Sequence, residues 1–187
     1  MKELAIFGST GSIGCSTLNV VRRHRDRFAV SILAAGRNLQ LLIEQIREFN
    51  PRHVYIIGEK DAAVLKALFP GLDIYRGEDG MDKVSRLTDF DIGVSALVGV
   101  AGLRPTWNMI NNGKTVALAN KEVLVAGGRL VMEAARKQGA ALLTVDSEHS
   151  AIMQCLRGEN HGEIERILLT ASGGPFFDRE ILSLIHI

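Results

Sequence analysis

The sequence predicts an α/β protein built on a doubly wound parallel sheet. Three observations predict this fold: short apolar runs recur along the 187 residues, amphipathic segments separate them, and a glycine-rich loop follows the first run. Strands that alternate with helices pair in parallel, and the helices cover both faces of the sheet. Hydrophobic residues make up 47% of the chain, which is ample for such a core.

The expected elements follow from apolar runs and helical periodicity. Eight runs are predicted as strands: Leu4–Phe7, Phe28–Ala34, His53–Ile57, Leu72–Tyr75, Ile92–Leu97, Thr115–Leu118, Ala141–Val145 and Ile164–Thr170. Helices are predicted directly after the glycine-rich loop and in four further segments: Leu39–Phe49, Leu103–Ile110, Leu130–Gln138 and Ser150–Leu156. In each of the first two of these segments, apolar residues recur at helical spacing, and Asn50-Pro51 or Gly113 ends the pattern.

The first strand opens into a loop with three evenly spaced glycines, Gly8, Gly11 and Gly14. Glycine lets the backbone turn sharply and approach a ligand closely. The helix that follows presents free N–H groups and a positive dipole end to an anion. In a Rossmann-like fold such a loop holds a dinucleotide pyrophosphate. The spacing differs from the commoner G-x-G-x-x-G, so a glycine-rich turn without a ligand is the alternative.

The second strand ends in Ala35-Gly36-Arg37-Asn38, where a Rossmann-like domain meets the adenosine ribose. An acidic residue here favours NAD, whereas a basic one accommodates the 2′-phosphate of NADP. Arg37 has a planar guanidinium that suits a phosphate. Asn38 also has a purely structural interpretation as the N-cap of the next helix, and both roles can hold together.

Two further predicted strands end in polar clusters, Asn120-Lys121-Glu122 and Asp146-Ser147-Glu148-His149-Ser150. Open α/β sheets place ligands at such ends. While the chain stays extended, Asp146 and Glu148 point to one side, and their oxygens suit Mg²⁺ or Mn²⁺ rather than Zn²⁺. The alternative is that Asp146 or Ser147 caps a helix whose first turn contains Glu148.

Composition excludes several classes of protein. The net charge of +1 argues against a nucleic-acid partner, and the basic run Arg22–Arg25 is interpreted as a solvated helix end. No apolar run is long enough to span a bilayer, and no signal peptide precedes the first strand. Cys15 and Cys155 suggest no disulfide framework, which favours a reducing cytoplasm.

Five motifs in order resemble the 1-deoxy-D-xylulose 5-phosphate reductoisomerase family. They are GSTGSIG at Gly8–Gly14, AGRN at Ala35–Asn38, ALANKE at Ala117–Glu122, VDSEHSA at Val145–Ala151 and TASGGPF at Thr170–Phe176. The resemblance implies an NADPH- and divalent-metal-dependent enzyme of the bacterial cytoplasm. It would rearrange and reduce 1-deoxy-D-xylulose 5-phosphate to 2-C-methyl-D-erythritol 4-phosphate in isoprenoid biosynthesis, as a homodimer when complete.

The resemblance also implies a role for each matching residue. The NADPH-binding positions are Thr10, Gly11, Ser12, Ile13, Gly36, Arg37, Asn38, Asn120 and Glu122. Asp146 and Glu148 match two of three metal-ligating carboxylates. The substrate contacts are Lys121, Ser147, Glu148 and Ser172. Lys121 and Glu148 are the candidate catalytic residues, with Lys121 either moving a proton or orienting substrate oxygens.

The sequence departs from the family pattern after Phe176. The family continues into a loop with a Trp, residues that hold the substrate phosphate, a third metal-binding Glu and a helical domain, none of which is matched here. The tail Ile181–Ile187 is apolar and atypical. We therefore expect a cofactor domain over 1–146 and the truncated start of an α+β catalytic domain over 147–187, inactive by itself.

Other classes remain as alternatives. The first is an NADP-binding fragment or module without catalysis. Short-chain reductases need a Tyr followed four residues later by Lys, but Glu59 and Asp79 occupy those places after Tyr55 and Tyr75. An aspartate-semialdehyde-type dehydrogenase needs an activated Cys, and neither cysteine lies in such an environment.

Overall fold

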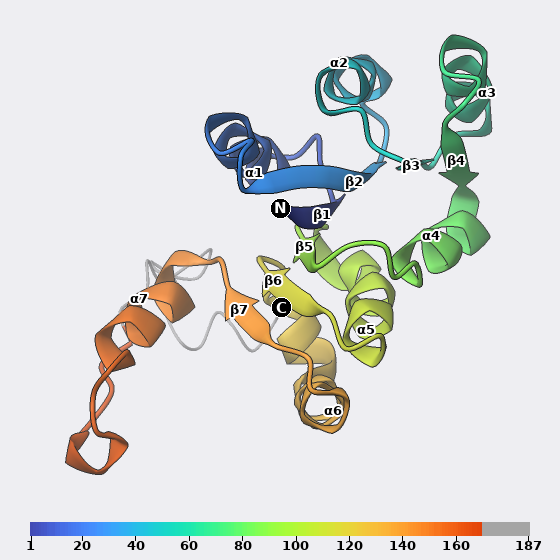
Figure 1. Cartoon of the computed structure of the whole chain (residues 1–187). Coiled ribbons are helices and arrows are strands. Elements are labelled where there is room, and N and C mark those ends of the chain that lie inside the picture. The colour runs from blue at the N-terminus through green and yellow to red at the C-terminus, as the bar shows by residue number, and fades with distance from the viewer. Residues whose placement is uncertain (170–187) are drawn as a thin grey trace, which may run out of the picture. The chain divides into compact units, whose positions relative to one another are not determined.

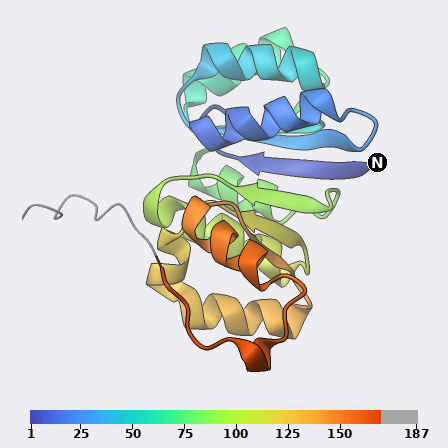
Figure 2. The same ribbon diagram turned by 90° about the vertical axis from the view of Figure 1, so that its left-hand side faces the viewer.

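The computed structural model describes residues 1–169, and it contains the predicted parallel sheet. The strands lie in the order β4-β3-β2-β1-β5-β6-β7 (Figure 1), and each neighbouring pair is parallel. They are β1 (Lys2–Phe7), β2 (Phe28–Ala35), β3 (His53–Ile56), β4 (Asp73–Arg76), β5 (Ile92–Ser95), β6 (Thr115–Leu118) and β7 (Leu142–Thr144). In Figure 2 the strands run across the view, and the N-terminus marks the edge at which they begin.

Helices cover both faces of this sheet, as the doubly wound fold requires. Helices α1, α2 and α3 pack on one face, and α4, α5 and α6 pack on the other. The helices are α1 (Ser12–Arg23), α2 (Leu39–Phe49), α3 (Glu59–Leu68), α4 (Gly77–Ser85), α5 (Leu103–Asn111), α6 (Glu122–Gln138) and α7 (Ser147–Leu156), with two short 3₁₀ helices, η1 (Gly99–Gly102) and η2 (His161–Glu163). The predicted fold class is therefore confirmed.

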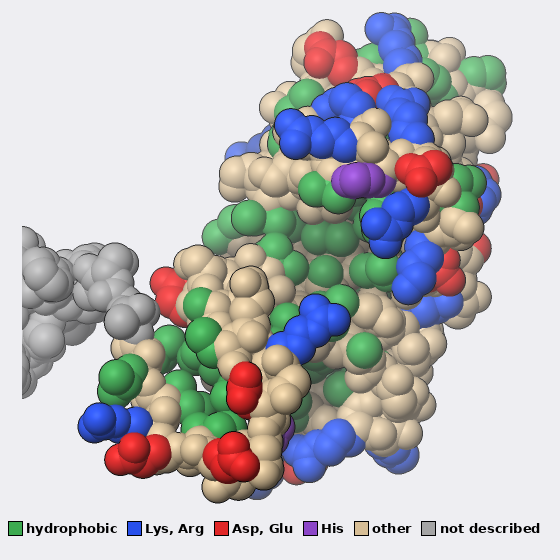
Figure 3. Space-filling model, turned by 60° about the vertical axis from the view of Figure 1, so that its left-hand side comes forward, with side chains coloured by type: hydrophobic (Ala, Val, Ile, Leu, Met, Phe, Trp, Pro, Cys, Tyr) green, Lys and Arg blue, Asp and Glu red, His purple; other side chains and the backbone are tan. Residues whose placement is uncertain are grey.

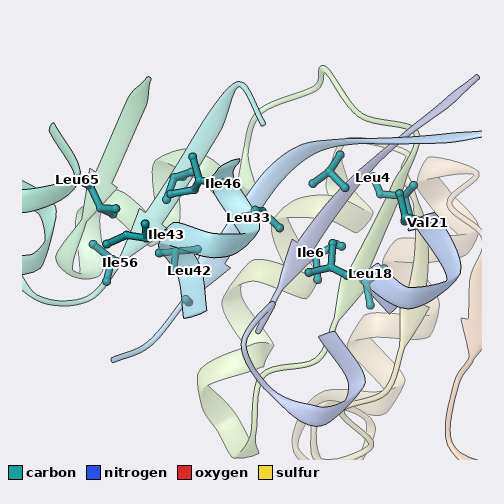
Figure 4. Close-up of a cluster of buried hydrophobic side chains, with 14 of the residues drawn as sticks. Leu4, Ile6, Leu18, Val21, Leu33, Leu42, Ile43, Ile46, Ile56 and Leu65 are labelled. Carbon is teal, nitrogen blue, oxygen red and sulfur yellow. The ribbon is translucent and has the colours of Figure 1, made fainter. Parts of the chain in front are cut away.

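Strand β1 lies at the centre because its residues are apolar on both sides. Ile6 and Phe7 are fully buried, on opposite faces. Figure 4 shows Ile6 beside Leu18 of α1, within the cluster that also contains Leu33 of β2. The strand order reverses between β1 and β5, and ligands of open α/β sheets bind at the carboxyl ends of strands around such a reversal.

A β-bulge interrupts the pairing of β1 with β2. Leu4 pairs with Val30 and Ala5 pairs with Ile32, so Ser31 is the extra residue. Val30 and Leu33 consequently face the same core cluster although they lie an odd number of residues apart. A bulge of this kind inverts the in-and-out alternation of the strand that carries it.

The strand predictions are confirmed for the first seven runs, within a residue or two at their ends. The eighth is wrong over Ile164–Leu169, where the backbone forms no strand, and Thr170 lies outside the described residues. A strand is stable only when a neighbour pairs with its N–H and C=O groups. From Val145 to Leu169 there is no other strand to serve as that neighbour.

The helix predictions missed α3 and α4, whose buried faces are small: α3 buries Ala62 and Leu65, and α4 buries Gly80, Val84 and Ser85. Helix α6 begins at Glu122 rather than Leu130 and is kinked at Gly127, whose φ is −141° and ψ is 20°. Helix α7 begins at Ser147 rather than Ser150. The predicted solvated end of α1 is confirmed, because Arg22–Arg25 are exposed and Arg22 donates to Glu48 over 2.6 Å.

The chain divides into two compact units, of which the first is Met1–Thr144 and the second begins at Val145. Both are described separately below. No helix within residues 1–169 is long and apolar enough to cross a bilayer. On the face drawn in Figure 3, Lys and Arg side chains gather in the upper part, above a band of hydrophobic side chains.

Candidate cofactor-binding edge and carboxylate segment

The glycine loop between β1 and α1 is built for a sharp reversal of the chain. Gly8 has a φ of +97°, and a Cβ there would lie 2.5 Å from the carbonyl oxygen of Ala96. A Cβ on Gly14 would overlap the Gly8 carbonyl. Side chains are therefore excluded at both positions: the positive φ and the close backbone approach both require glycine at Gly8, and the close approach alone requires it at Gly14.

The loop delivers the N-terminus of α1 to the carboxyl edge of the sheet. The first turn of α1 contains no acidic residue, and its N-cap, Gly11, offers no side-chain acceptor. Because the first intrahelical acceptor serves Cys15 N, the N–H groups of Ser12, Ile13 and Gly14 have no acceptor within the helix. Gly11, Ser12 and Ile13 are exposed. Free N–H groups at an exposed helix N-terminus are the kind of donor that anions accept in proteins.

The end of β2 lies beside this loop. The N–H groups of Gly8 and Ser9 both donate to the carbonyl of Ala34, over 2.8 and 2.9 Å. Gly36, Arg37 and Asn38 follow and are exposed. The Asn38 side chain accepts from Leu41 N at 3.2 Å, which confirms its predicted role as the N-cap of α2. The exposed guanidinium of Arg37 thus follows the strand that pairs with β1.

The end of β6 contributes a buried amide rather than an exposed one. Asn120 is 3% exposed, and its Nδ2 donates to the Gly99 carbonyl over 2.7 Å. Within the described residues its Oδ1 has no hydrogen-bond partner. Lys121 is the N-cap residue of α6 and Glu122 begins that helix; both are exposed. The Asn120 side chain therefore links the start of α6 to η1, and its Oδ1 is a buried acceptor without a partner among the described residues.

A cavity of about 580 Å³ opens on the same edge of the first unit, and Gly36, Tyr55, Glu78 and Arg104 line it together with apolar side chains. Burial, with a smaller contribution from the Glu78 carboxylate, raises the pKa of the Tyr55 hydroxyl. Neither Tyr55 nor Arg104 was predicted as a site residue. Arg104 offered one signal, since a cation in the first turn of α5 opposes the helix dipole.

The second unit contains the carboxylate segment Asp146–His149. Asp146 caps α7, since its Oδ1 accepts from His149 N at 2.9 Å, and His149 Nδ1 lies 2.7 and 2.8 Å from its two oxygens. Burial raises the pKa of Asp146, but the hydrogen bonds from the His149 backbone and ring outweigh it and lower the pKa overall. His149 was not predicted as a partner, although an Asp three residues before a His at a helix start could have indicated it.

Of the two interpretations of this segment, the helix cap is confirmed and the extended one does not apply. Asp146 has extended backbone, but α7 begins at Ser147, so Glu148 lies in its first turn. Ser147 Oγ donates to Glu148 Oε2 over 2.8 Å. Among residues 1–169, no group of three His, Cys, Asp or Glu side chains could hold a metal ion. Ser172 lies outside the described residues.

Comparison with known protein families matches both units. The family model described as 1-deoxy-D-xylulose 5-phosphate reductoisomerase matches residues 4–128. The model described as the C-terminal domain of the same enzyme matches residues 142–187, a range that includes the apolar tail.

Individual relatives agree with these matches. The reductoisomerase of Prosthecochloris aestuarii is 53% identical over 178 residues, covering 94% of this chain and 47% of that protein. That of Bacillus cereus (strain Q1) is 45% identical over 187 residues, covering 100% of this chain and 49% of that protein. The chain thus spans about half the length of the curated relatives it matches.

Solved structures show the same relationship. The reductoisomerase of Zymomonas mobilis in complex with NADPH superimposes with a TM-score of 0.86 at 38% identity, over 97% of this chain and 48% of that one. A reductoisomerase in complex with NADPH, fosmidomycin and magnesium gives a TM-score of 0.86 at 35% identity, over 100% of this chain and 49% of that one. This chain therefore belongs to the 1-deoxy-D-xylulose 5-phosphate reductoisomerase family.

Proposed function

We propose that the protein containing this chain converts 1-deoxy-D-xylulose 5-phosphate into 2-C-methyl-D-erythritol 4-phosphate, using NADPH and Mg²⁺ or Mn²⁺. Its membership of the reductoisomerase family supports the reaction. One observation carries the cofactor assignment. Strands β1 and β2 pair with each other, and they are followed by the free N-terminus of α1 and by the exposed Arg37, respectively. A bound NADPH would supply the hydride.

The residues at the carboxyl edge of the sheet fit the pyrophosphate and the 2′-phosphate of NADPH. Thr10, Ser12 and Ile13 would offer backbone N–H groups to the pyrophosphate, because they form the loop and the first turn of α1. Gly11, whose N–H donates to Gly8, would contact the cofactor through its exposed backbone without a side chain in the way. Arg37 would bind the 2′-phosphate, as the exposed Gly36 leaves the backbone accessible and Asn38 fixes the chain after it. The unpaired Oδ1 of Asn120 and the carboxylate of Glu122 are the remaining proposed contacts to the cofactor.

The carboxylate segment fits a hard divalent cation in its donor chemistry. Asp146 and Glu148 offer only oxygen atoms, which Mg²⁺ and Mn²⁺ prefer. The hydrogen bonds from His149 keep Asp146 ionised and orient it. A bound cation would supply Lewis-acid stabilisation of charge developing on the substrate oxygens. Lys121, Ser147, Glu148 and Ser172 are the proposed substrate contacts.

For the polypeptide 1–187 by itself we propose NADPH binding without turnover. This alternative keeps the proposed cofactor contacts of the first unit, while Asp146 and Glu148 supply two of the three metal-ligating carboxylates that the resemblance implies. The complete protein is proposed to act as a homodimer in the bacterial cytoplasm, with a phosphorylated sugar as its small-molecule partner.

Direct titration of polypeptide 1–187 with NADPH and NADH tests the cofactor assignment. We expect tighter binding of NADPH, and Arg37→Asp should weaken NADPH roughly 10- to 100-fold, because a charge-assisted bond to the 2′-phosphate is lost and repulsion replaces it. Arg47→Asp, an exposed arginine on α2, is the matched control. Absent NADPH binding, or equal affinity in wild type and Arg37→Asp, would contradict the assignment.

A further inference from the structure

A buried side chain of α2 reaches across to the glycine loop. Gln45 is 5% exposed and Ser9 is fully buried. Gln45 Nε2 donates to the carbonyl of Ser9 over 2.9 Å. The thiol of Cys15, on α1, lies 3.7 Å from the same carbonyl oxygen. The Ser9 carbonyl is therefore held from two helices that are separated in sequence.

This amide is costly for a core position. The other buried positions of α2 are occupied by Leu42, Ile43 and Ile46. Gln45 Oε1 and Ser9 Oγ are buried without a hydrogen-bond partner among the described residues. An unpaired buried polar atom is destabilising, so a fourth aliphatic side chain would be the better choice for packing alone. What the amide adds is its donor to Ser9.

That donor fixes the direction of one peptide group. The peptide between Ser9 and Thr10 is planar and trans, so its N–H points opposite to its C=O. With the Ser9 carbonyl turned toward Gln45, the Thr10 N–H faces away from Gln45. Gly8 N and Ser9 N donate to Ala34 and Gly11 N donates to Gly8. Thr10 N is the one loop N–H from Gly8 to Gly11 with no acceptor among residues 1–169.

We infer that Gln45 is a positioning residue for the pyrophosphate of the cofactor, an inference that rests on the proposed NADPH binding. By holding the Ser9 carbonyl, it presents the Thr10 N–H beside the free N–H groups at the start of α1. Its amide nitrogen reaches Ser9 O and, at 4.0 Å, Cys15 Sγ, and both of these partners belong to the loop and α1. Loss of its donor weakens the binding of every ligand that carries the pyrophosphate, and the dissociation constants of NADPH and NADH rise by the same factor.

The test compares Gln45→Met, which keeps the length of the side chain and removes the donor, with Gln45→Glu, which replaces the donor by an acceptor. Gln40→Met is the matched control, because Gln40 is an exposed glutamine on the same helix and donates to Glu44. Dissociation constants for NADPH and for NADH are measured on polypeptide 1–187 well below the melting temperature of each variant. The amide signal of Thr10 is followed by NMR during the titration.

We expect Gln45→Met to weaken NADPH and NADH by the same factor, roughly fivefold to tenfold, and Gln40→Met to change neither. In wild type the Thr10 amide signal should shift on binding, and the shift should shrink in Gln45→Met. Unchanged affinities in a folded Gln45→Met variant, even with a lower melting temperature, would overturn the inference and leave NADPH binding intact. A loss confined to NADPH would also overturn it, while a wild-type chain that binds neither dinucleotide would refute the proposed function itself. If Gln45→Glu fails to fold, Gln45→Met alone decides.

Discussion

The glycine loop and the carboxylate segment Asp146–His149 are both short polar runs that follow a strand, but they are held in different ways. The loop is fixed by groups distant in sequence, namely the Ala34 carbonyl and the Gln45 amide. Asp146 is held by His149, three residues along the chain, and α7 has no buried residue. The glycine loop is therefore held by contacts from distant segments, whereas the carboxylate segment is held within one helical turn.

The carboxylate segment gives the largest expected effect. In a chimera that joins this chain to the C-terminal half of the Bacillus cereus relative, Asp146→Asn or Glu148→Gln should lower metal-dependent turnover about a thousandfold, because a hard anionic ligand is lost. NADPH affinity should stay unchanged, since the loop is held independently. Near-normal turnover of either variant at limiting Mg²⁺ would break the comparison, because the segment would then not hold the cation.

Substitution within the loop should act on folding and on cofactor binding together. Gly14→Ala places a Cβ against the Gly8 backbone, so we expect the free energy of unfolding to fall by about 2–4 kcal/mol and NADPH binding to be lost. Gly71→Ala is the control, because a Cβ there meets nothing within 4 Å. Urea denaturation and NADPH titration measure the two effects; a stable Gly14→Ala variant with normal affinity would show that the loop is not rigid.

Asp89, a carboxylate held by residues distant in sequence, sharpens the comparison with the locally held Asp146. Asp89 Oδ2 accepts from Ser31, Arg52 and His53 over 3.0–3.1 Å. Burial raises the pKa of Asp89, but the bonds from Arg52, His53 and Ser31 outweigh it, so the pKa lies below its usual value. Asp89→Asn should cost about 1–2 kcal/mol of unfolding free energy at neutral pH, because one charged acceptor serves three segments.

The pH dependence of that cost has a definite sign. A lowered pKa in the folded state contributes stability that is present above the unfolded pKa and is lost as pH falls through the folded pKa. The difference between wild type and Asp89→Asn should therefore persist down to about pH 5 and shrink below about pH 4. Denaturation curves across that range, with Asp146→Asn as the comparison, measure it. A difference that grows as the pH falls below about 4 would contradict the assignment.

The part of the fold that the sequence predicts well is the part with continuous apolar runs. Strand β1 is buried on both faces, so its run Leu4–Phe7 could be identified without any long-range information. The phosphate-facing loop follows directly from it. Helices α3 and α4 were missed because each buries only two or three residues, which gives a weak apolar stripe. The strand predicted at Ile164–Thr170 failed over Ile164–Leu169 because a strand depends on a partner that periodicity cannot reveal.

Contacts between distant residues were beyond prediction for the same reason. Gln45 interrupts an apolar helix face, and nothing in its neighbours indicates that it reaches Ser9. Asp146 was correctly given a capping alternative, because an N-cap is a local pattern. The contact between Asp146 and the His149 ring could not be predicted, because it depends on a helix that begins at Ser147, and the predicted helix began at Ser150.

The β-bulge at Ser31 also affects the geometry of the proposed cofactor site. The extra residue lies before Ala34, whose carbonyl accepts from Gly8 N and Ser9 N. It therefore determines which residue of β2 pairs with Phe7. Neighbouring strands lie about 4.8 Å apart and each residue advances a strand by about 3.3 Å. Deleting Ser31 would slide Arg37 by one such step relative to the helix N-terminus. The distance between the two proposed phosphate-binding positions, Arg37 and the N-terminus of α1, thereby depends on the register of β1 and β2.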